Sequence, residues 1–209
     1  MVRHGAELAV EDEQGQVWHC LARQNMGHPV CGDRVVWQAS GLDRGVVTSI
    51  QPRQTVLSRP DYSGRNKALA ANLTQLVAVL APRPEPNAYL LDQYLAAAER
   101  LGVKALIACN KADLLETQDR ATMTGLLAPY ERIGYPLIWL SLFNDRDLAS
   151  LSTRLVGETS ILVGQSGVGK SSLVKALLPD LDIQTGRLSQ ATGLGRHTTS
   201  TATCYRLPV

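Results

Sequence analysis

The sequence predicts an α/β protein in which a small N-terminal β-barrel precedes a domain built on a mostly parallel sheet. Between residues 7 and 60, five short alternating segments are separated by glycines and prolines, a rhythm typical of small barrels. After residue 72, apolar runs alternate with helical patterns, which indicates parallel strands joined by crossover helices. One of these strands leads into a glycine-rich loop followed by a helix, a further mark of the α/β class.

The elements follow from these patterns one by one. In the barrel domain, residues 1–60, we expect strands at 6–10, 16–22, 33–38, 45–50 and 55–58, followed by a polar linker at 61–72. In the second domain, residues 73–209, we expect strands at 76–80, 103–109, 136–140, 160–163 and 201–207. Helices are expected at 88–101, 118–133 and 145–155, with a last one beginning inside 169–178.

Composition sets the class of protein only broadly. The chain has 209 residues, 44% of them hydrophobic, and a formal net charge of +2, which suits a globular protein and does not by itself demonstrate a nucleic-acid partner. We expect a cytoplasmic protein with no membrane partner, because the sequence contains neither a membrane-length apolar run nor a signal peptide. We also expect a monomer. Cys20, Cys31, Cys109 and Cys204 lack metal-ligand spacing, so we expect reduced, buried or half-buried thiols.

The strongest motif is a phosphate-binding loop that matches G-x-x-x-x-G-K-[ST] between a strand and a helix. Its glycines permit positive φ angles, so that successive N–H groups can point at phosphate oxygens. Lys170 is expected to bridge the β- and γ-phosphates, and the Ser171 hydroxyl to bind magnesium. The predicted phosphate-binding residues are Gly164, Gln165, Ser166, Gly167, Val168, Gly169, Lys170, Ser171 and Ser172.

A second motif indicates which base is bound. Asn110, Lys111, Ala112 and Asp113 follow the predicted strand 103–109, at the strand end where open α/β sheets bind ligands. Asp113 can accept hydrogen bonds from N1 and N2 of guanine, donors that adenine does not offer in that arrangement. Taken alone, the string is equally compatible with a solvated turn. Ser141 and Leu142, after the next strand, are placed to contact the base, although an ordinary connecting loop has the same appearance.

The order of the motifs is unusual, because residues 110–113 precede the phosphate loop by some fifty positions. With a β-barrel first, and with the segment 192–199 (Thr-Gly-Leu-Gly-Arg-His-Thr-Thr) after the phosphate loop, the chain resembles the RsgA (YjeQ) family of bacterial GTPases. Segments 29–37 and 52–61 resemble the OB-fold signatures of that family, and 70–75 resembles its entry into the GTPase domain. The resemblance implies an OB-fold followed by a circularly permuted P-loop GTPase domain that binds GTP, GDP and magnesium.

The resemblance also implies a role late in the assembly of the small ribosomal subunit, with hydrolysis stimulated by that subunit and the OB-fold docked on ribosomal RNA. Residues 195–199 resemble the first switch loop, in which Thr198 or Thr199 would complete the magnesium shell. His197 is the candidate for positioning the attacking water, or else an exposed loop histidine. Residues 44–67 carry five cations and one acid, which favours contact with RNA phosphates or indicates only a solvated face.

Compared with the family, the sequence lacks the Asp-x-x-Gly segment and the C-terminal zinc-binding domain. It also lacks the basic N-terminal extension. We therefore expect a C-terminally incomplete GTPase domain, with zinc needed only in the missing domain, that retains GDP affinity and hydrolyses GTP poorly. The alternative is an RNA-binding module gated by nucleotide, with hydrolysis incidental. An ATPase or kinase is disfavoured by Asp113 and by the lack of a recognisable phosphoacceptor base.

Overall fold

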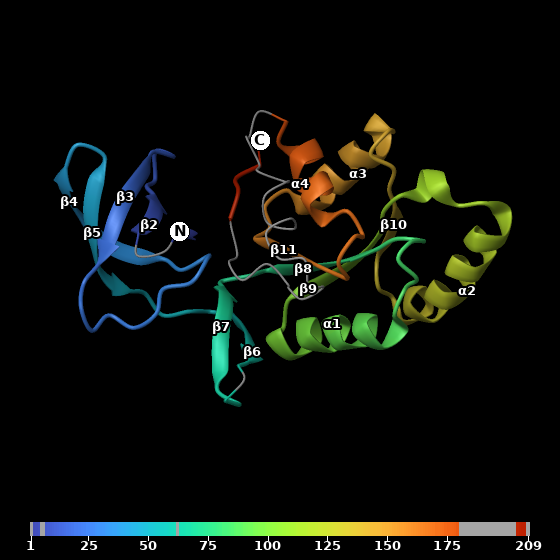
Figure 1. Ribbon diagram of the computed structural model, residues 1–209, viewed down its shortest axis with the longest axis horizontal. Helices are drawn as coiled ribbons and strands as arrows, with labels where there is room; N and C mark the ends of the chain where they lie inside the picture. Colours follow the sequence, from blue (N-terminus) through green and yellow to red (C-terminus); the bar gives the residue numbers. More distant parts are fainter. Residues whose placement is uncertain (1, 5–6, 62, 180–203, 208–209) are drawn as a thin grey trace, which may run out of the picture. The chain divides into compact units, whose positions relative to one another are not determined.

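A computed structural model describes residues 2–4, 7–61, 63–179 and 204–207 (Figure 1). The chain divides into two compact units. The first unit runs to Leu73 and includes 204–206, whereas the second begins at Thr74 and includes Leu207. No helix within the described residues is both long enough and apolar enough to cross a membrane.

The first unit is built on a five-stranded sheet with the strand order β1-β2-β3-β5-β4, antiparallel except for the parallel pair of β3 and β5. Its strands are β1 (Val2–His4), β2 (Glu7–Glu11), β3 (Val17–Ala22), β4 (Val35–Gly41) and β5 (Arg44–Ile50). Leu8, Val10, Cys20 and Val47 are buried on one face, with Trp18 and Trp37 packed against them. Four of the five strands predicted for the small N-terminal unit are in this sheet, as β2 to β5, and β1 is an additional strand; the fifth predicted strand, 55–58, lies in a separate two-stranded sheet.

Half of the expected linker at 61–72 is a strand, because β7 occupies Asn66–Ala71. Strands β6 (Val56–Pro60) and β7 (Asn66–Ala71) form a separate antiparallel hairpin. The sequence of β7 is polar at its start and rich in alanine afterwards, so it lacks the β-branched residues that mark a strand. Pairing with β6, together with the hydrogen bond from Ala71 N to Cys31 O (2.9 Å), overrides that weak propensity.

A buried ion pair holds the loop before β4 in place. Asp33 is buried, and its carboxylate accepts hydrogen bonds from Arg53 Nε (2.7 Å), Arg53 Nη2 (2.8 Å) and Val30 N (2.8 Å). Arg53 Nη2 also donates to His28 O (3.0 Å). The hydrogen bond to Asp33 raises the pKa of Arg53 above its ordinary value. The bidentate contact with Arg53 therefore pairs the carboxylate charge of Asp33, which would otherwise be costly to bury.

The residues just before the end of the chain differ from the expected strand at 201–207. Residues 204–207 have no regular secondary structure, and 201–203 lie outside the described residues. Instead, Arg206 Nη1 donates to Glu11 Oε1 (2.8 Å), and Leu207 packs against the apolar core of the second unit. Side-chain contacts thus take the place of the strand pairing predicted for this segment.

The cysteines are all free, but Cys204 is exposed, contrary to the expected burial. Its thiol is hydrogen-bonded to that of Cys31, and this interaction lowers the pKa of Cys204 to about 6 while raising that of Cys31. The pairing of residues so distant in the chain left no signal in the cysteine spacing.

The second unit contains a four-stranded parallel sheet with the order β10-β9-β8-β11. Its strands are β8 (Gln75–Leu80), β9 (Lys104–Cys109), β10 (Leu137–Trp139) and β11 (Ser160–Val163). Its helices are α1 (Ala88–Leu101), α2 (Thr117–Ile133), α3 (Asp145–Leu155) and α4 (Lys170–Leu177), with a short 3₁₀ helix η1 at Ala112–Leu114. These positions match the predicted elements to within about two residues, which confirms the predicted alternation of strands and helices.

Helices cover both faces of this sheet, as Figure 1 shows. Strand β8 is buried along its whole length, and its side chains alternate between two apolar clusters. Leu76 and Ala78 belong to the cluster that includes α1 and α2, whereas Val77 and Val79 belong to the cluster that includes α3 and α4. The doubly covered parallel sheet leaves its strand ends as the place for a ligand.

Replacing Arg53 by alanine tests the buried ion pair. The carboxylate of Asp33 would then be buried without its cation, so we expect the free energy of unfolding to fall by about 3–5 kcal/mol. Urea denaturation of the variant measures this. Arg34→Ala is the matched control, because Arg34 is a neighbouring exposed arginine and its loss should cost less than about 0.5 kcal/mol. Equal stability of the two variants would contradict a structural role for Arg53.

Candidate nucleotide-binding site

The phosphate loop, residues 164–171, connects β11 to α4 and is shaped by three glycines with positive φ. Gly164 has φ 150°, and a Cβ there would lie 2.2 Å from Val79 O. Gly169 has φ 95° and caps the N-terminus of α4, where a Cβ would lie 2.4 Å from Asn110 Nδ2. Only glycine meets both demands at these positions, because any side chain would be strained and would also clash.

Lys170 begins α4 and folds back over the loop. Its Nζ donates hydrogen bonds to Gly164 O (2.9 Å) and Gln165 O (2.7 Å). Burial lowers the pKa of Lys170, because desolvation disfavours its charged form. The loop therefore holds a half-buried ammonium group at a helix N-terminus, where an anion is favoured by both the positive charge and the helix dipole.

The other predicted residues of the loop differ in exposure. Val168 is fully buried and anchors the loop in the core. Ser166 and Gly167 form an exposed turn, and Ser171 and Ser172 lie exposed in the first turn of α4. Both serines are thus solvent-exposed residues next to the loop.

Asn110 joins the end of β9 to the phosphate loop. Its backbone N–H donates to Leu80 O (2.8 Å), and its Nδ2 donates to Val168 O (2.9 Å). The residue is fully buried, and its Oδ1 has no hydrogen-bond partner. A buried acceptor without a partner is costly, which marks this oxygen as an unsatisfied polar group at the phosphate loop.

Lys111 connects the same two loops from the exposed side. It has a left-handed backbone, φ 59°, and its Nζ donates to Gly167 O (2.7 Å) and to Arg83 O (3.2 Å). Its aliphatic stem passes near Gly169, where an added Cβ would lie 3.9 Å from Lys111 Cε. Asn110 and Lys111 thereby fix the spacing between the base-reading motif and the phosphate loop.

Asp113 lies exposed on η1, with its carboxylate oriented by a neighbouring strand end. Its Oδ1 accepts a hydrogen bond from Ser141 Oγ (2.8 Å), and Ser141 N in turn donates to Asp147 Oδ2 (3.0 Å). The backbone of Ala112 is tied to the same strand through Ala112 N to Leu140 O (2.9 Å). The predicted base-contacting loop therefore positions the carboxylate, while Leu142 packs against the core.

Several contributors to the site carried no sequence motif. Tyr94 on α1 is half-buried beside the phosphate loop, where desolvation raises the pKa of its hydroxyl and the Gly164 N–H partly opposes that shift. Asp147 orients Ser141, and Pro84 lies 3.6 Å from the place where a Cβ of Gly167 would stand. In the sequence, Tyr94 falls at helical spacing with the apolar residues of its helix, and this pattern predicted only that Tyr94 packs in the core. His197, Thr198 and Thr199, the predicted switch residues, lie outside the described residues.

The residues present fit a nucleotide phosphate with magnesium. The glycine cradle would be filled by any Cβ, and Lys170 supplies the cation beside it. Over the described residues there is no group of three or more His, Cys, Asp or Glu side chains that could hold a metal alone. Ser171 is the residue of the loop that would hold magnesium together with phosphate oxygens, which is the usual way this small cation binds at nucleotide sites.

These features define a class of protein: an α/β protein of the P-loop type in which an Asn-Lys-Ala-Asp motif precedes the phosphate loop, in permuted order. The family model for the RsgA GTPase matches residues 50–209. The chain therefore belongs to the RsgA GTPase family.

Individual relatives agree with this assignment. The chain is 46% identical over 208 residues to the "Small ribosomal subunit biogenesis GTPase RsgA" of Azotobacter vinelandii and 47% identical over 204 residues to that of Pseudomonas aeruginosa strain LESB58. Each alignment covers 98% of this chain, and 61% and 60% of the respective relative. The chain thus spans about three fifths of the length of the curated relatives it matches.

Solved structures show the same fold. YjeQ from Thermotoga maritima is 30% identical with a TM-score of 0.71, over 88% of this chain and 65% of that one. YloQ, described as a circularly permuted GTPase, is 28% identical with a TM-score of 0.66, over 86% of this chain and 63% of that one. The predicted fold class and family are confirmed.

Gly169→Ala tests the close approach of the two loops. The new Cβ would collide with Asn110 Nδ2 and would force the loops apart. We expect the affinity for GDP to fall at least about 100-fold, because several charge-assisted hydrogen bonds to the phosphates would be lost. Calorimetric titration measures the affinity. Gly157→Ala is the matched control, because Gly157 also has positive φ (75°) but faces open space. Undiminished GDP binding by Gly169→Ala would contradict the described contact.

Proposed function

We propose that this chain binds guanine nucleotide at the site above, hydrolyses GTP, and acts in late maturation of the small ribosomal subunit. The observation that carries the proposal is the pair of hydrogen bonds from Asn110 Nδ2 to Val168 O and from Lys111 Nζ to Gly167 O. They bring a base-reading motif and a phosphate loop into one site. The printed names of the relatives supply the ribosomal context.

Guanine selectivity rests on Asp113. Its carboxylate accepts from Ser141 Oγ through Oδ1 and retains further acceptor capacity. Guanine presents donors at N1 and N2 to such a carboxylate, whereas adenine would leave it facing an acceptor. Unpaired polar groups in a site built for hydrogen bonds give strong discrimination.

Phosphate binding rests on residues 164–172. The backbone N–H groups of the loop and the N-terminus of α4 would hold the β-phosphate, and Lys170 would exchange its bonds to Gly164 O and Gln165 O for phosphate oxygens. Ser171 would ligate magnesium, which supplies charge neutralisation between the β- and γ-phosphates. Ser172 would support the loop or reach the α-phosphate.

Hydrolysis would depend on the segment after α4. We propose that Thr198 or Thr199 completes the magnesium shell and senses the γ-phosphate, and that His197 positions the attacking water. A loop that both senses GTP and contacts ribosomal RNA would couple the two partners. The competing function is a nucleotide-gated RNA-binding module in which hydrolysis is incidental.

Calorimetry with GDP, GTP and ATP tests base selectivity. We expect GDP and GTP to bind at least about 100-fold more tightly than ATP, because Asp113 has no matching donors on adenine. Asp113→Asn should shift the preference from guanine toward xanthine, since the amide replaces an acceptor with a donor. Asp145→Asn, an equal charge change at an exposed position of α3, should leave selectivity unaltered. Equal affinities for GTP and ATP would reject a guanine site.

Turnover measurements separate the two functions. A ribosome-linked GTPase should hydrolyse GTP at least about ten-fold faster in the presence of purified small ribosomal subunits, whereas a simple binder would show no stimulation. Lys170→Ala gives the background rate, because it removes the cation that faces the transferred phosphate. Stimulation absent from an otherwise GTP-binding chain would favour the RNA-binding module.

A further inference from the structure

Two cysteines from distant parts of the sequence meet within the first unit. Cys31 belongs to the loop between β3 and β4, and Cys204 belongs to the segment 204–206, which is part of the same compact unit. The S–H group of Cys31 donates a hydrogen bond to the sulfur of Cys204. Neither cysteine is part of a disulfide. The two sulfur atoms are therefore neighbours, and a covalent bond between them requires little rearrangement.

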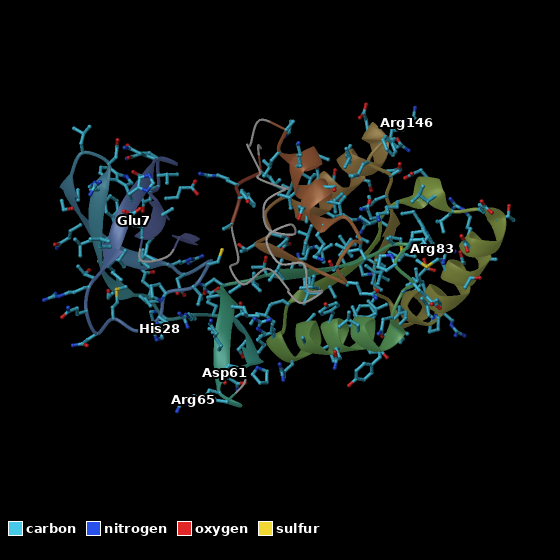
Figure 2. All side chains as sticks on the ribbon, in the orientation of Figure 1. Glu7, His28, Asp61, Arg65, Arg83 and Arg146 are labelled. Carbon is cyan, nitrogen blue, oxygen red and sulfur yellow. The ribbon has the colours of Figure 1, made fainter. Side chains whose placement is uncertain are left out.

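The backbone around Cys31 is held in place by other parts of the first unit. Cys31 O accepts a hydrogen bond from Ala71 N (2.9 Å), and Cys31 forms an isolated bridge with Ala70. Figure 2 shows His28 on the same loop, where its carbonyl oxygen accepts a hydrogen bond from Arg53 Nη2 (3.0 Å). The loop therefore presents the Cys31 thiol from a fixed backbone.

Cys204 combines exposure with a stabilised thiolate. The residue is exposed, and its segment is tied to β2 by the ion pair of Arg206 Nη1 with Glu11 Oε1 (2.8 Å). The hydrogen bond from Cys31 lowers the pKa of Cys204 to about 6, although burial and the charge of Glu11 oppose this shift. At neutral pH the sulfur of Cys204 is thus mainly thiolate, which is the form that oxidants attack.

The other two cysteines of the chain have the opposite character. Cys20 and Cys109 are both buried. Desolvation raises the pKa of each thiol, that of Cys109 to about 12. Buried, neutral thiols react slowly with oxidants, so Cys20 and Cys109 serve as controls within the same molecule.

We propose that Cys31 and Cys204 form a reversible oxidative modification site whose oxidant is hydrogen peroxide. The Cys204 thiolate attacks the O–O bond of the peroxide, which gives a sulfenic acid and releases hydroxide. The Cys31 sulfur then attacks the sulfenic sulfur, so that the S–S bond forms and the S–O bond breaks. The hydroxyl group leaves as water with the proton of the Cys31 thiol, and the two sulfurs have together lost two electrons to the peroxide. A dithiol reductant reverses the step by thiol–disulfide exchange. The site is independent of the proposed nucleotide function.

Peroxide treatment of the intact, reduced chain at neutral pH tests this site. After the remaining thiols are blocked with an alkylating agent, peptide mapping by mass spectrometry without reductant identifies each cysteine. We expect a linked peptide that contains Cys31 and Cys204, and oxidation of Cys204 at least about ten-fold faster than that of Cys20 or Cys109, because only Cys204 is an exposed thiolate. Cys31→Ser should stop the reaction at the sulfenic acid of Cys204, which dimedone captures. Cys204→Ser, the matched variant, should leave Cys31 as a free thiol.

A second measurement detects the bond through its effect on stability. A disulfide between segments so distant in the sequence restricts the unfolded chain, so the thermal midpoint of the treated wild type should rise by at least about 4 °C. The same treatment of Cys204→Ser should leave its midpoint unchanged. Equal shifts in the two proteins would overturn the proposal. So would oxidation of the four cysteines at equal rates, or accumulation of sulfinic acid at Cys204 in the wild type without the linked peptide.

Discussion

The hydrogen bond from Asn110 Nδ2 to Val168 O is the contact on which the site depends. It is fully buried, and it joins the end of one strand to the loop after another. Because Gly169 has no side chain, the amide can approach the loop backbone closely. The phosphate loop, the motif at 110–113 and the N-terminus of α4 are thereby connected by direct hydrogen bonds, an arrangement that preorganises a site. Lys111 repeats the connection from the exposed side.

Strand order in space, rather than order in the sequence, explains why a permuted chain can assemble this site. Strand β8 lies between β9 and β11, and all four strands of the sheet run parallel. The loops after β9, β10 and β11 therefore emerge at one edge, whichever strand the chain enters first. Asn110, Ser141 and Gly164 each follow one of these strands. The permuted order changes only the connections and leaves the geometry at this edge available.

The sequence was most informative where periodicity and motif coincided. The phosphate loop and the flanking strand and helix were predicted almost to the residue, because glycine positions, a buried strand and a helix start all indicated one structure. Strand β7 was missed, because its stability comes from pairing and its alanines carry little β-propensity. The hydrogen bond from Ser141 to Asp113 could not be predicted from the sequence either, because the sheet, and not the local sequence, brings their two loops together. Such tertiary contacts have no local signature.

The same limit applies to charge. Arg53, Arg59, Arg65 and Lys67 form a single basic run in the sequence, and only three-dimensional context separates them. Arg53 is bound on two sides and stabilises a loop, so its charge is already neutralised. Arg59 and Lys67 repel each other across a hairpin whose one carboxylate is held within its turn. A basic run in the sequence therefore has a different meaning at each position, depending on which cations the fold pairs with buried carboxylates.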